Sequence, residues 1–249
     1  MPSELILAAL GSCTVGLFIG WCGVAGFLLP ILFVNACGLS VTESLLASFL
    51  CFAVSGAIGS LNYRRRGELP LRPALTLSAG SLAGGLLGAA LGGLLEPATV
   101  KTVLYVVVLL SGAAIAVREL RPQKGREGQV FPKPLPLLVL GFATALLCAL
   151  SGAGGPVLVM PLLVAMGVPA KMAVGTALLD SVSIALPAIA VYAARCRPLA
   201  ILPVLLLAAL GHAAGVFVGS VTAARVPQTL LKRGVAVFSI CFALFMLLK

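Results

Sequence analysis

Two glycine- and proline-rich stretches interrupt long apolar segments at matched places, and each could bind an anion. The first covers residues 20–26 and is followed by Pro30, and the second covers residues 151–156 and is followed by Pro161. Unwinding a helix inside a membrane exposes peptide groups that must face a cavity, a neighbour or a ligand. The helix that restarts after a break directs free N–H groups and its positive dipole end toward that place. Paired breaks of this kind are typical of the substrate site in duplicated membrane transporters.

Polar residues at membrane depth form two stripes that we expect to line a cavity beside the breaks. In each stripe the residues recur at helical spacing, so they share one face of a helix. Hydroxyl groups can donate hydrogen bonds to an anion without adding a fixed charge. The alternative for any one hydroxyl is a hydrogen bond to its own helix, and the alternative for the glycine and proline breaks is packing. The stripes comprise Thr176, Asp180, Ser183 and Pro187 in one segment, and Ser44, Ser48, Ser55 and Gly59 in another, with Glu43 nearer its end.

Asp180 and His212 are the candidates for proton coupling. Asp180 is the only acidic residue well inside a predicted span, and His212 is the only histidine. Ionisable groups inside a membrane are costly to bury and often mark a proton or ion pathway. The alternative is that these two side chains pair with each other in a structural role.

Composition identifies the elements that carry these residues as membrane helices. The chain is 61% hydrophobic and 10% charged, with a mean hydropathy of +1.17. Its apolar segments are long enough for helices that cross the membrane, and they lack the alternation typical of a membrane barrel. We therefore predict an all-α integral membrane protein with about eight transmembrane helices. The predicted spans are 5–35, 41–62, 71–95, 98–118, 135–166, 171–194, 199–222 and 227–248.

The net charge of +10 comes from basic residues in the short connections, which favours a topology signal over nucleic-acid binding. With eight crossings and a cytoplasmic N-terminus, twelve of the seventeen basic residues are cytoplasmic. Residues 64–66 then lie inside and Lys171 lies outside, where it would attract anions or extend toward the lipid interface. The sequence has no cleavable signal signature. We predict a multi-pass protein of a bacterial-type cytoplasmic membrane with both termini cytoplasmic.

The cysteines do not form a metal site or a disulfide framework. All seven are scattered singly through or beside the spans, without a C-x-x-C or Cys/His cluster. The sequence also lacks a convincingly placed nucleophile or acid/base pair. We therefore predict no cofactor, no metal and no enzymatic activity, and a membrane-embedded enzyme is the weakest interpretation.

A hydrophilic stretch divides the chain into two similar halves. The expected organisation is a first repeat over 1–120, a basic cytoplasmic linker over 121–133 and a second repeat over 134–249, with four helices per repeat and the first helix broken. Two geometries remain open. Four crossings per half give parallel repeats, whereas a re-entrant first segment gives inverted repeats with Arg195 and Arg197 outside. The alignment matches Pro30 to Pro161, Tyr63 to Tyr192, and Gly84, Gly88 and Gly92 to Gly211, Gly215 and Gly219.

These features resemble the TauE/SafE, or sulfite exporter, family over essentially the whole chain. The resemblance rests on the break followed by proline in each half, the glycine series of the third helices, and the Gly-Val-Pro-Ala turn at 167–170 that leads into Gly175 and Thr176. It implies a transporter in the lipid bilayer that moves sulfite, an organosulfonate or another small sulfur-containing anion. The oligomeric state stays open, a homodimer included.

We therefore expect a secondary carrier that exports such an anion by alternating access, with or without proton linkage. The sequence has no ATP-binding motif. An anion channel and a carrier for an unrelated small solute remain as alternatives. The predicted substrate-binding residues are Gly20, Cys22, Gly23, Gly26, Ser48, Ser151, Gly152, Gly154, Gly155, Pro156 and Thr176.

Overall fold

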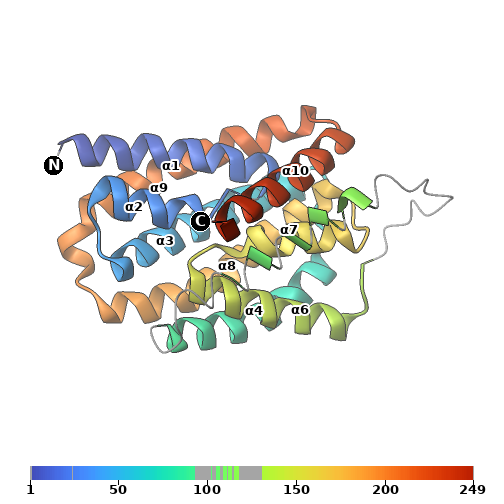
Figure 1. The fold of residues 1–249 in the computed structure, drawn as a ribbon, viewed down its shortest axis with the longest axis horizontal. Coiled ribbons are helices and arrows are strands. Elements are labelled where there is room, and N and C mark those ends of the chain that lie inside the picture. Colours follow the sequence, from blue (N-terminus) through green and yellow to red (C-terminus); the bar gives the residue numbers. More distant parts are fainter. Residues whose placement is uncertain are drawn as a thin grey trace.

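Long apolar helices build the protein (Figure 1). The computed structural model describes residues 2–23, 25–92 and 131–248, together with 102, 105–106, 109–110, 112–113 and 115–117. Within these residues all regular structure is helical, and six helices are long and apolar enough to cross a membrane. The all-α prediction is confirmed for them. Most of the predicted span 98–118 lies outside the described residues.

Helix bounds agree with the predicted spans except at the two breaks. The first predicted span is divided into α1 (Pro2–Cys22) and α2 (Leu28–Cys37), and the fifth is divided into α6 (Pro134–Ser151) and α7 (Gly155–Ala165). The remaining helices are α3 (Val41–Arg65), α4 (Leu71–Leu91), α8 (Ala170–Arg195), α9 (Leu202–Thr222) and α10 (Gln228–Leu248), with short 3₁₀ turns at Pro198–Ile201 and Ala223–Arg225.

Glycine conformation ends the helices at both breaks. Gly23 and Gly152 have φ angles of 74° and 71°, in the left-handed region that only glycine adopts without strain. Gly154 follows with a φ of 76° and stands directly before α7, whose first turn contains Pro156. Proline suits this first turn because its missing N–H has no helical partner there. The sequence placed both breaks correctly.

The chain reverses direction after each break, which corrects the prediction of a single broken crossing. Helix α2 returns alongside α1, and a Cβ added to Gly11 of α1 would lie 2.7 Å from the Leu32 side chain of α2. Helix α1 has 21 residues and is long enough to cross by itself, whereas α2 has only 10. Figure 1 shows α7 turning back after α6 in the same way. Each break therefore forms the tip of a hairpin between a long helix and a short one.

Corresponding helices of the two halves run in opposite directions. The Tyr63 hydroxyl donates to Gly20 O at 3.1 Å, so the C-terminal ends of α3 and α1 lie together. The Tyr192 hydroxyl donates to Ala149 O at 2.8 Å, which brings the ends of α8 and α6 together. Helices α3 and α8 are antiparallel, because Phe49 near the start of α3 stacks on Tyr192 near the end of α8. The described helices thus have the inverted geometry, not the parallel one.

Each first helix packs along the third helix of the opposite half. Six glycines permit this contact, since a Cβ at any of them would overlap a backbone carbonyl of the facing helix. The two contacts are equivalent only if the glycine match is moved by one helical turn from the sequence alignment, so that Gly80 corresponds to Gly211. The facing pairs are Gly211 with Ala9, Gly215 with Cys13, Gly219 with Leu17, Gly80 with Leu138, Gly84 with Phe142 and Gly88 with Leu146.

The antiparallel halves give the bundle two chemically different ends. The Arg66 end contains the C-terminal ends of α1, α3 and α9 and the N-terminal ends of α4, α6 and α8. The Arg195 end contains the opposite ends of these helices. Arg66 and Lys171 both contact Glu68 at the Arg66 end. The prediction that residues 64–66 and Lys171 lie on opposite sides is therefore wrong, because it assumed a single crossing where the chain forms a hairpin.

Candidate substrate site

The two breaks face each other in the interior. A Cβ added to Gly26 would lie 3.0 Å from Ala153 O, and one added to Gly23 would lie 3.4 Å from the Pro156 Cβ. The ring of Phe52, from α3, contacts both breaks, because Cβ atoms at Gly26 and Gly154 would each approach it within 3.0 Å. Residues predicted from two distant parts of the sequence therefore form one region.

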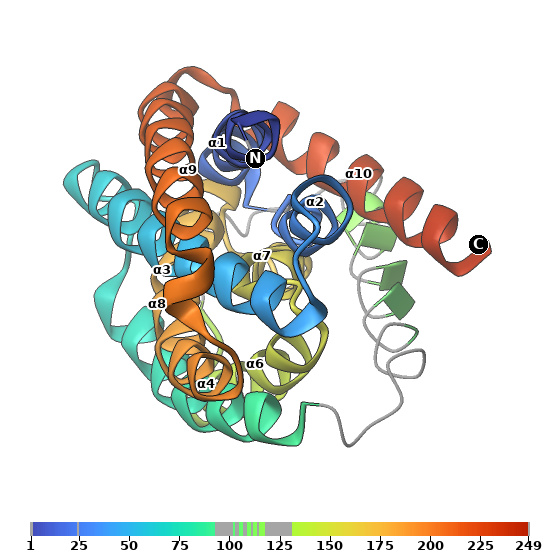
Figure 2. The same cartoon turned by 90° about the vertical axis from the view of Figure 1, so that its left-hand side faces the viewer.

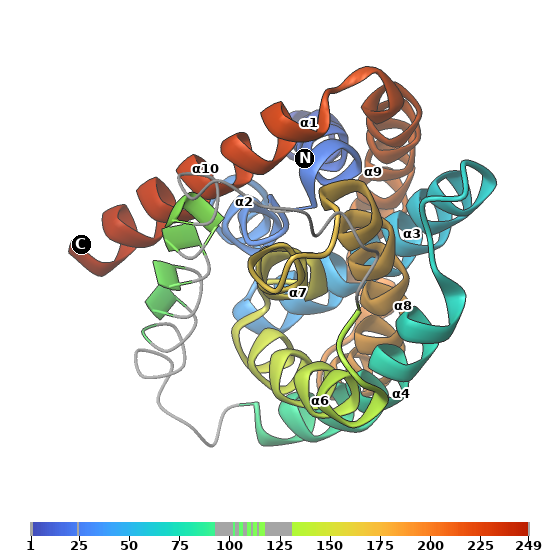
Figure 3. The ribbon, with the colours of Figure 1, turned by 90° about the vertical axis from the view of Figure 1, so that its right-hand side faces the viewer.

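Two short helices begin at this region. Helix α2 starts at Leu28 directly after the first break, and α7 starts at Gly155 directly after the second. The views from the two ends of the bundle show α7 beside α2 (Figures 2 and 3). The side chains of residues 157–161 are buried. Two positive helix ends thus meet in a protected place, which is a suitable environment for an anion.

Several of the predicted polar ligands instead bond to their own helices. Ser48 Oγ donates to Ser44 O at 2.6 Å, and Ser151 Oγ donates to Leu147 O at 2.8 Å. Cys22 Sγ lies 3.2 Å from Phe18 O, one turn earlier. The alternative given for these groups, a hydrogen bond within their own helix, is the one seen. A serine bonded in this way would have to rotate its hydroxyl away from the carbonyl to donate to an anion.

Gly20 has a packing role. A Cβ at this residue would lie 2.6 Å from Ser220 N and 2.8 Å from Val216 O of α9. Its carbonyl oxygen accepts a hydrogen bond from the Tyr63 hydroxyl. Gly20 therefore holds α1 against α9 and α3 at the Arg66 end of the bundle.

Two predicted residues of α8, Thr176 and Asp180, keep unused hydrogen-bonding groups. Both are fully buried, and Thr176 Oγ1 and both Asp180 carboxylate oxygens have no hydrogen-bond partner in the part of the chain that the structure describes. They lie one turn apart on α8. Ser81 of α4 is beside Asp180, but its hydroxyl donates to Leu77 O at 3.1 Å. This face of α8 can therefore still bind a proton or a polar solute.

His212 does not pair with Asp180, so the predicted structural pair is wrong. Its Nδ1 lies 2.9 Å from Ser12 O of α1, and its Nε2 has no partner among the described residues. Asp180 instead lies near Ser81 of α4 and Cys148 of α6. The two ionisable groups occupy different helix contacts, because α9 packs on α1 and α8 packs on α4.

Comparison with known proteins identifies the family. A sequence model of the sulfite exporter TauE/SafE family matches residues 5–246. The chain belongs to this family. Searches of curated proteins and of solved structures found no match. Membership in the TauE/SafE family implies a multi-pass membrane transporter of sulfite or organosulfonate-type anions, and not an enzyme.

Two arginines in this TauE/SafE chain carry contacts that sequence reasoning missed. Arg66 Nη1 donates to Ser220 O at 2.7 Å, near the C-terminal end of α9. Arg195 Nη1 donates to Ala89 O at 3.1 Å, near the C-terminal end of α4. Each arginine follows a tyrosine by three residues, at 63–66 and 192–195. This repeated Tyr-x-x-Arg pattern was visible in the sequence and would have indicated the matched contacts.

Proposed function

We propose that this TauE/SafE protein is a secondary carrier that exports a small sulfur-containing anion by alternating access. One observation supports this most strongly: two breaks from opposite halves adjoin each other, and a short helix begins at each. Gly23, Gly26, Gly152, Gly154, Gly155 and Pro156 form the anion site in this proposal, together with Thr176.

The chemistry of this region suits a substrate that must be bound and then released. Helix N-termini offer partial positive charge, and the Thr176 hydroxyl offers a donor without a full charge. A lysine or arginine in the same place would bind an anion more tightly and slow its release. The proposed site therefore favours turnover over affinity.

Asp180 and His212 remain the candidates for proton linkage. Asp180 lies one turn from Thr176, so proton uptake there would remove a negative charge beside the substrate. His212 lies on the α1–α9 contact and would act through helix movement. Net anion export itself needs no proton, because an inside-negative potential of about 100 mV supplies about 2.3 kcal/mol per charge.

The distribution of basic residues favours a cytoplasmic Arg66 end. Eight of the ten basic side chains that the structure describes belong to this end, and Arg195 and Arg197 belong to the other. By the positive-inside rule, the N-terminus then faces away from the cytoplasm. This orientation replaces the expected cytoplasmic termini in our proposal, and residues 1–120 and 134–249 remain the proposed repeats.

Counterflow in proteoliposomes tests this function. Proteoliposomes preloaded with unlabelled sulfite, taurine or sulfoacetate should take up the labelled solute faster than empty ones. The uptake rate should saturate as the external concentration of that solute rises. Thr176→Val should slow exchange about tenfold by removing the donor. Ser55→Ala is the matched control, because the Ser55 hydroxyl already donates to Phe52 O at 3.1 Å. An ohmic, non-saturating flux would identify a channel, and exchange of carboxylates alone would exclude the sulfur-anion assignment.

A further inference from the structure

The guanidinium of Arg66 is only partly used at its end of the bundle. Arg66 Nε donates to Glu68 Oε2 at 2.8 Å, and Nη1 donates to Ser220 O at 2.7 Å. Nη2 is buried and has no partner in the described part of the chain. The group lies over the ring of Tyr63, with its central carbon 4.4 Å from the ring centre. Its position is therefore fixed, while one of its donors stays unused.

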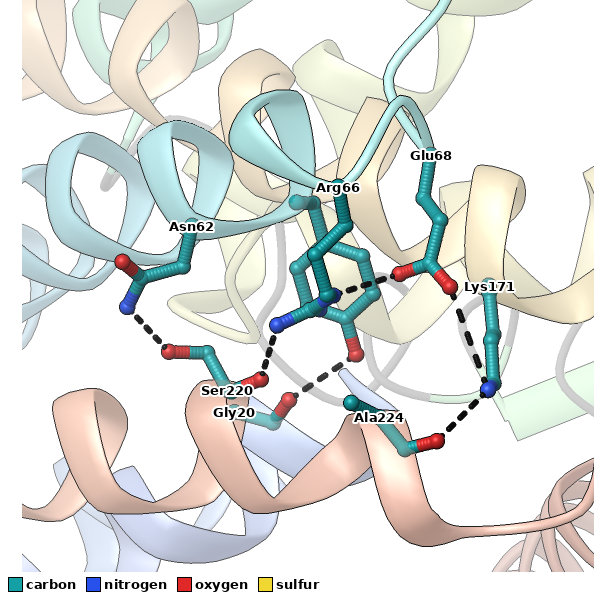
Figure 4. Close-up of polar contacts among 8 residues, drawn as sticks. Gly20, Asn62, Arg66, Glu68, Lys171, Ser220 and Ala224 are labelled. Atoms are coloured by element: carbon teal, nitrogen blue, oxygen red, sulfur yellow. Dashed lines mark hydrogen bonds and ion pairs between the residues drawn. The ribbon is translucent and has the colours of Figure 1, made fainter.

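Glu68 connects this guanidinium to a second cation (Figure 4). Lys171 Nζ lies 3.8 Å from Glu68 Oε1 and donates to Ala224 O at 3.1 Å. The side chains of Arg66, Glu68 and Lys171 are 23%, 22% and 15% exposed, so water still reaches the cluster. Two cations share one carboxylate, which leaves a local excess of positive charge.

The geometry leaves room for a better ligand than this carboxylate. The Nε and Nη2 atoms of an arginine form a fork that binds two oxygens of one anion side by side. Glu68 contacts this fork at Nε alone, because its other oxygen is directed toward Lys171. A sulfonate or sulfite group has three oxygens. It can place two oxygens on the Arg66 fork and the third on Lys171, which would pair the unused Nη2 donor.

We propose that Arg66 and Lys171 form a second anion-binding site at the mouth of the protein, and that Glu68 occupies it as a tethered competitor. An arriving sulfur oxyanion displaces the Glu68 carboxylate, which moves into water. The exchange replaces one ionic contact by another, so binding is weak and reversible. The site concentrates substrate at the mouth. This inference rests on the proposed function only for the chemical class of the anion.

The phosphate of a lipid headgroup has the same oxyanion chemistry. The free anion is favoured because the Arg66 guanidinium lies between α3 and α9, where it contacts Tyr63 and Ser220. The unpaired Nη2 atom is buried, which a bulky headgroup would reach with difficulty. The experiment separates the two sources.

Trp21 provides a local reporter for the test. It is the only tryptophan, and its Nε1 donates to Thr222 Oγ1 at 2.6 Å, between Ser220 and Ala224 in sequence. Purified full-length protein in neutral detergent is titrated with methanesulfonate at low ionic strength, and Trp21 fluorescence is recorded. We expect a saturable change that added salt weakens.

Two variants test the roles of the charged groups. Glu68→Gln removes the competitor and should lower the half-saturating concentration about threefold to tenfold. Arg66→Lys keeps the charge but removes the fork, and should raise that concentration at least about tenfold. Glu43→Gln is the control, because it removes a carboxylate at the Arg195 end, and glutamine preserves the capping box with Ser40. It should leave the titration unchanged.

Several results would overturn the proposal. A Glu68→Gln protein that is folded, yet has an unchanged or higher half-saturating concentration, shows that Glu68 does not compete. A fluorescence change in phosphatidylglycerol nanodiscs compared with phosphatidylcholine nanodiscs, without any response to methanesulfonate, assigns the site to a headgroup. If sulfur-anion counterflow fails but the Trp21 titration is intact, the proposed function is rejected and the mouth site stands. If counterflow succeeds but Trp21 does not respond to methanesulfonate, the mouth site is rejected and the proposed function stands.

Discussion

At the Arg66 end, a guanidinium, a carboxylate and an ammonium form one network, whereas the equivalent guanidinium at the Arg195 end binds backbone carbonyls. Arg195 donates to Ala89 O, Ala90 O and Gly92 O at distances between 2.8 and 3.1 Å. Both arginines therefore neutralise the negative end of a third helix from the opposite half. Within the residues that the structure describes, only Arg66 also has an acidic partner.

The comparison separates the contacts that both halves share from those found only at the Arg66 end. The tyrosine and arginine contacts recur in both halves, so they define how the halves are joined. Glu68 and Lys171 have no counterpart of the same chemistry, since the residues at matching positions are Arg197 and Thr42. We infer that the shared contacts hold the bundle at both ends, and that the ionic contacts are a feature of the Arg66 end alone among the described residues.

Replacing Arg66 or Arg195 should have the largest effect on the free energy of unfolding, and the loss should be larger for Arg66. Arg66→Gln leaves Glu68 and Ser220 O without their donor, and should lower the free energy of unfolding by about 2–3 kcal/mol. Arg195→Gln should cost about 1–2 kcal/mol, because only neutral helix-end carbonyls, two of them in exposed contacts, lose a partner. Thermal unfolding in detergent measures both. Equal losses would mean that the ion pair contributes nothing beyond the shared contact.

The tyrosines should behave alike and so mark the symmetric part. Tyr63→Phe and Tyr192→Phe each delete one hydroxyl that donates to a carbonyl at the end of a first helix. We expect a loss of about 1 kcal/mol for each variant. A clear difference between them in the same unfolding assay would show that the two halves are not joined equivalently.

A smaller effect concerns salt. Lys171 and Glu68 are 3.8 Å apart and partly exposed, so their attraction is worth about 0.2–1 kcal/mol and is screened by ions. Raising the ionic strength should lower the melting temperature of the wild type more than that of Lys171→Met. An equal decrease in the melting temperature of the two proteins would show that the Lys171–Glu68 ion pair does not contribute to stability.

Cys196 tests the orientation of the two ends. It lies at the Arg195 end, and burial, with a smaller effect of the Glu43 charge, raises the pKa of its thiol. A variant with Cys196 as its only cysteine should react with an impermeant maleimide added outside intact cells. The reaction should accelerate as the pH rises, because the thiolate is the reactive form. Labelling only after lysis would place this end in the cytoplasm.

Helix positions were predictable from the sequence because they follow local signals. Apolar length and glycine or proline placement gave the spans and both breaks, including Gly23 and Gly152. The turn direction after each break was not predictable, because a glycine permits both continuation and reversal. One reversal in each half changes the geometry from parallel to inverted, so a small local uncertainty decided the topology.

The candidate site was predicted in part. The breaks converge as expected, and Thr176 and Asp180 keep unused groups. The absent Asp180–His212 pair could not be foreseen, because it depends on which helices pack together. Arg66 was interpreted as a topology signal. Its hydrogen bond to the Ser220 carbonyl could not be predicted, because a count of basic residues in a turn does not indicate which backbone groups they contact.

The packing of α1 on α9 and of α4 on α6 has a consequence for synthesis of the chain. The ribosome completes α1 and α4 long before their glycine-lined contacts exist, so the first half must wait in the bilayer for partners from the second half. Such a half cannot complete its packing alone. A single half would complete this packing only with a second copy inserted in the opposite orientation, because each first helix packs on the third helix of the other half.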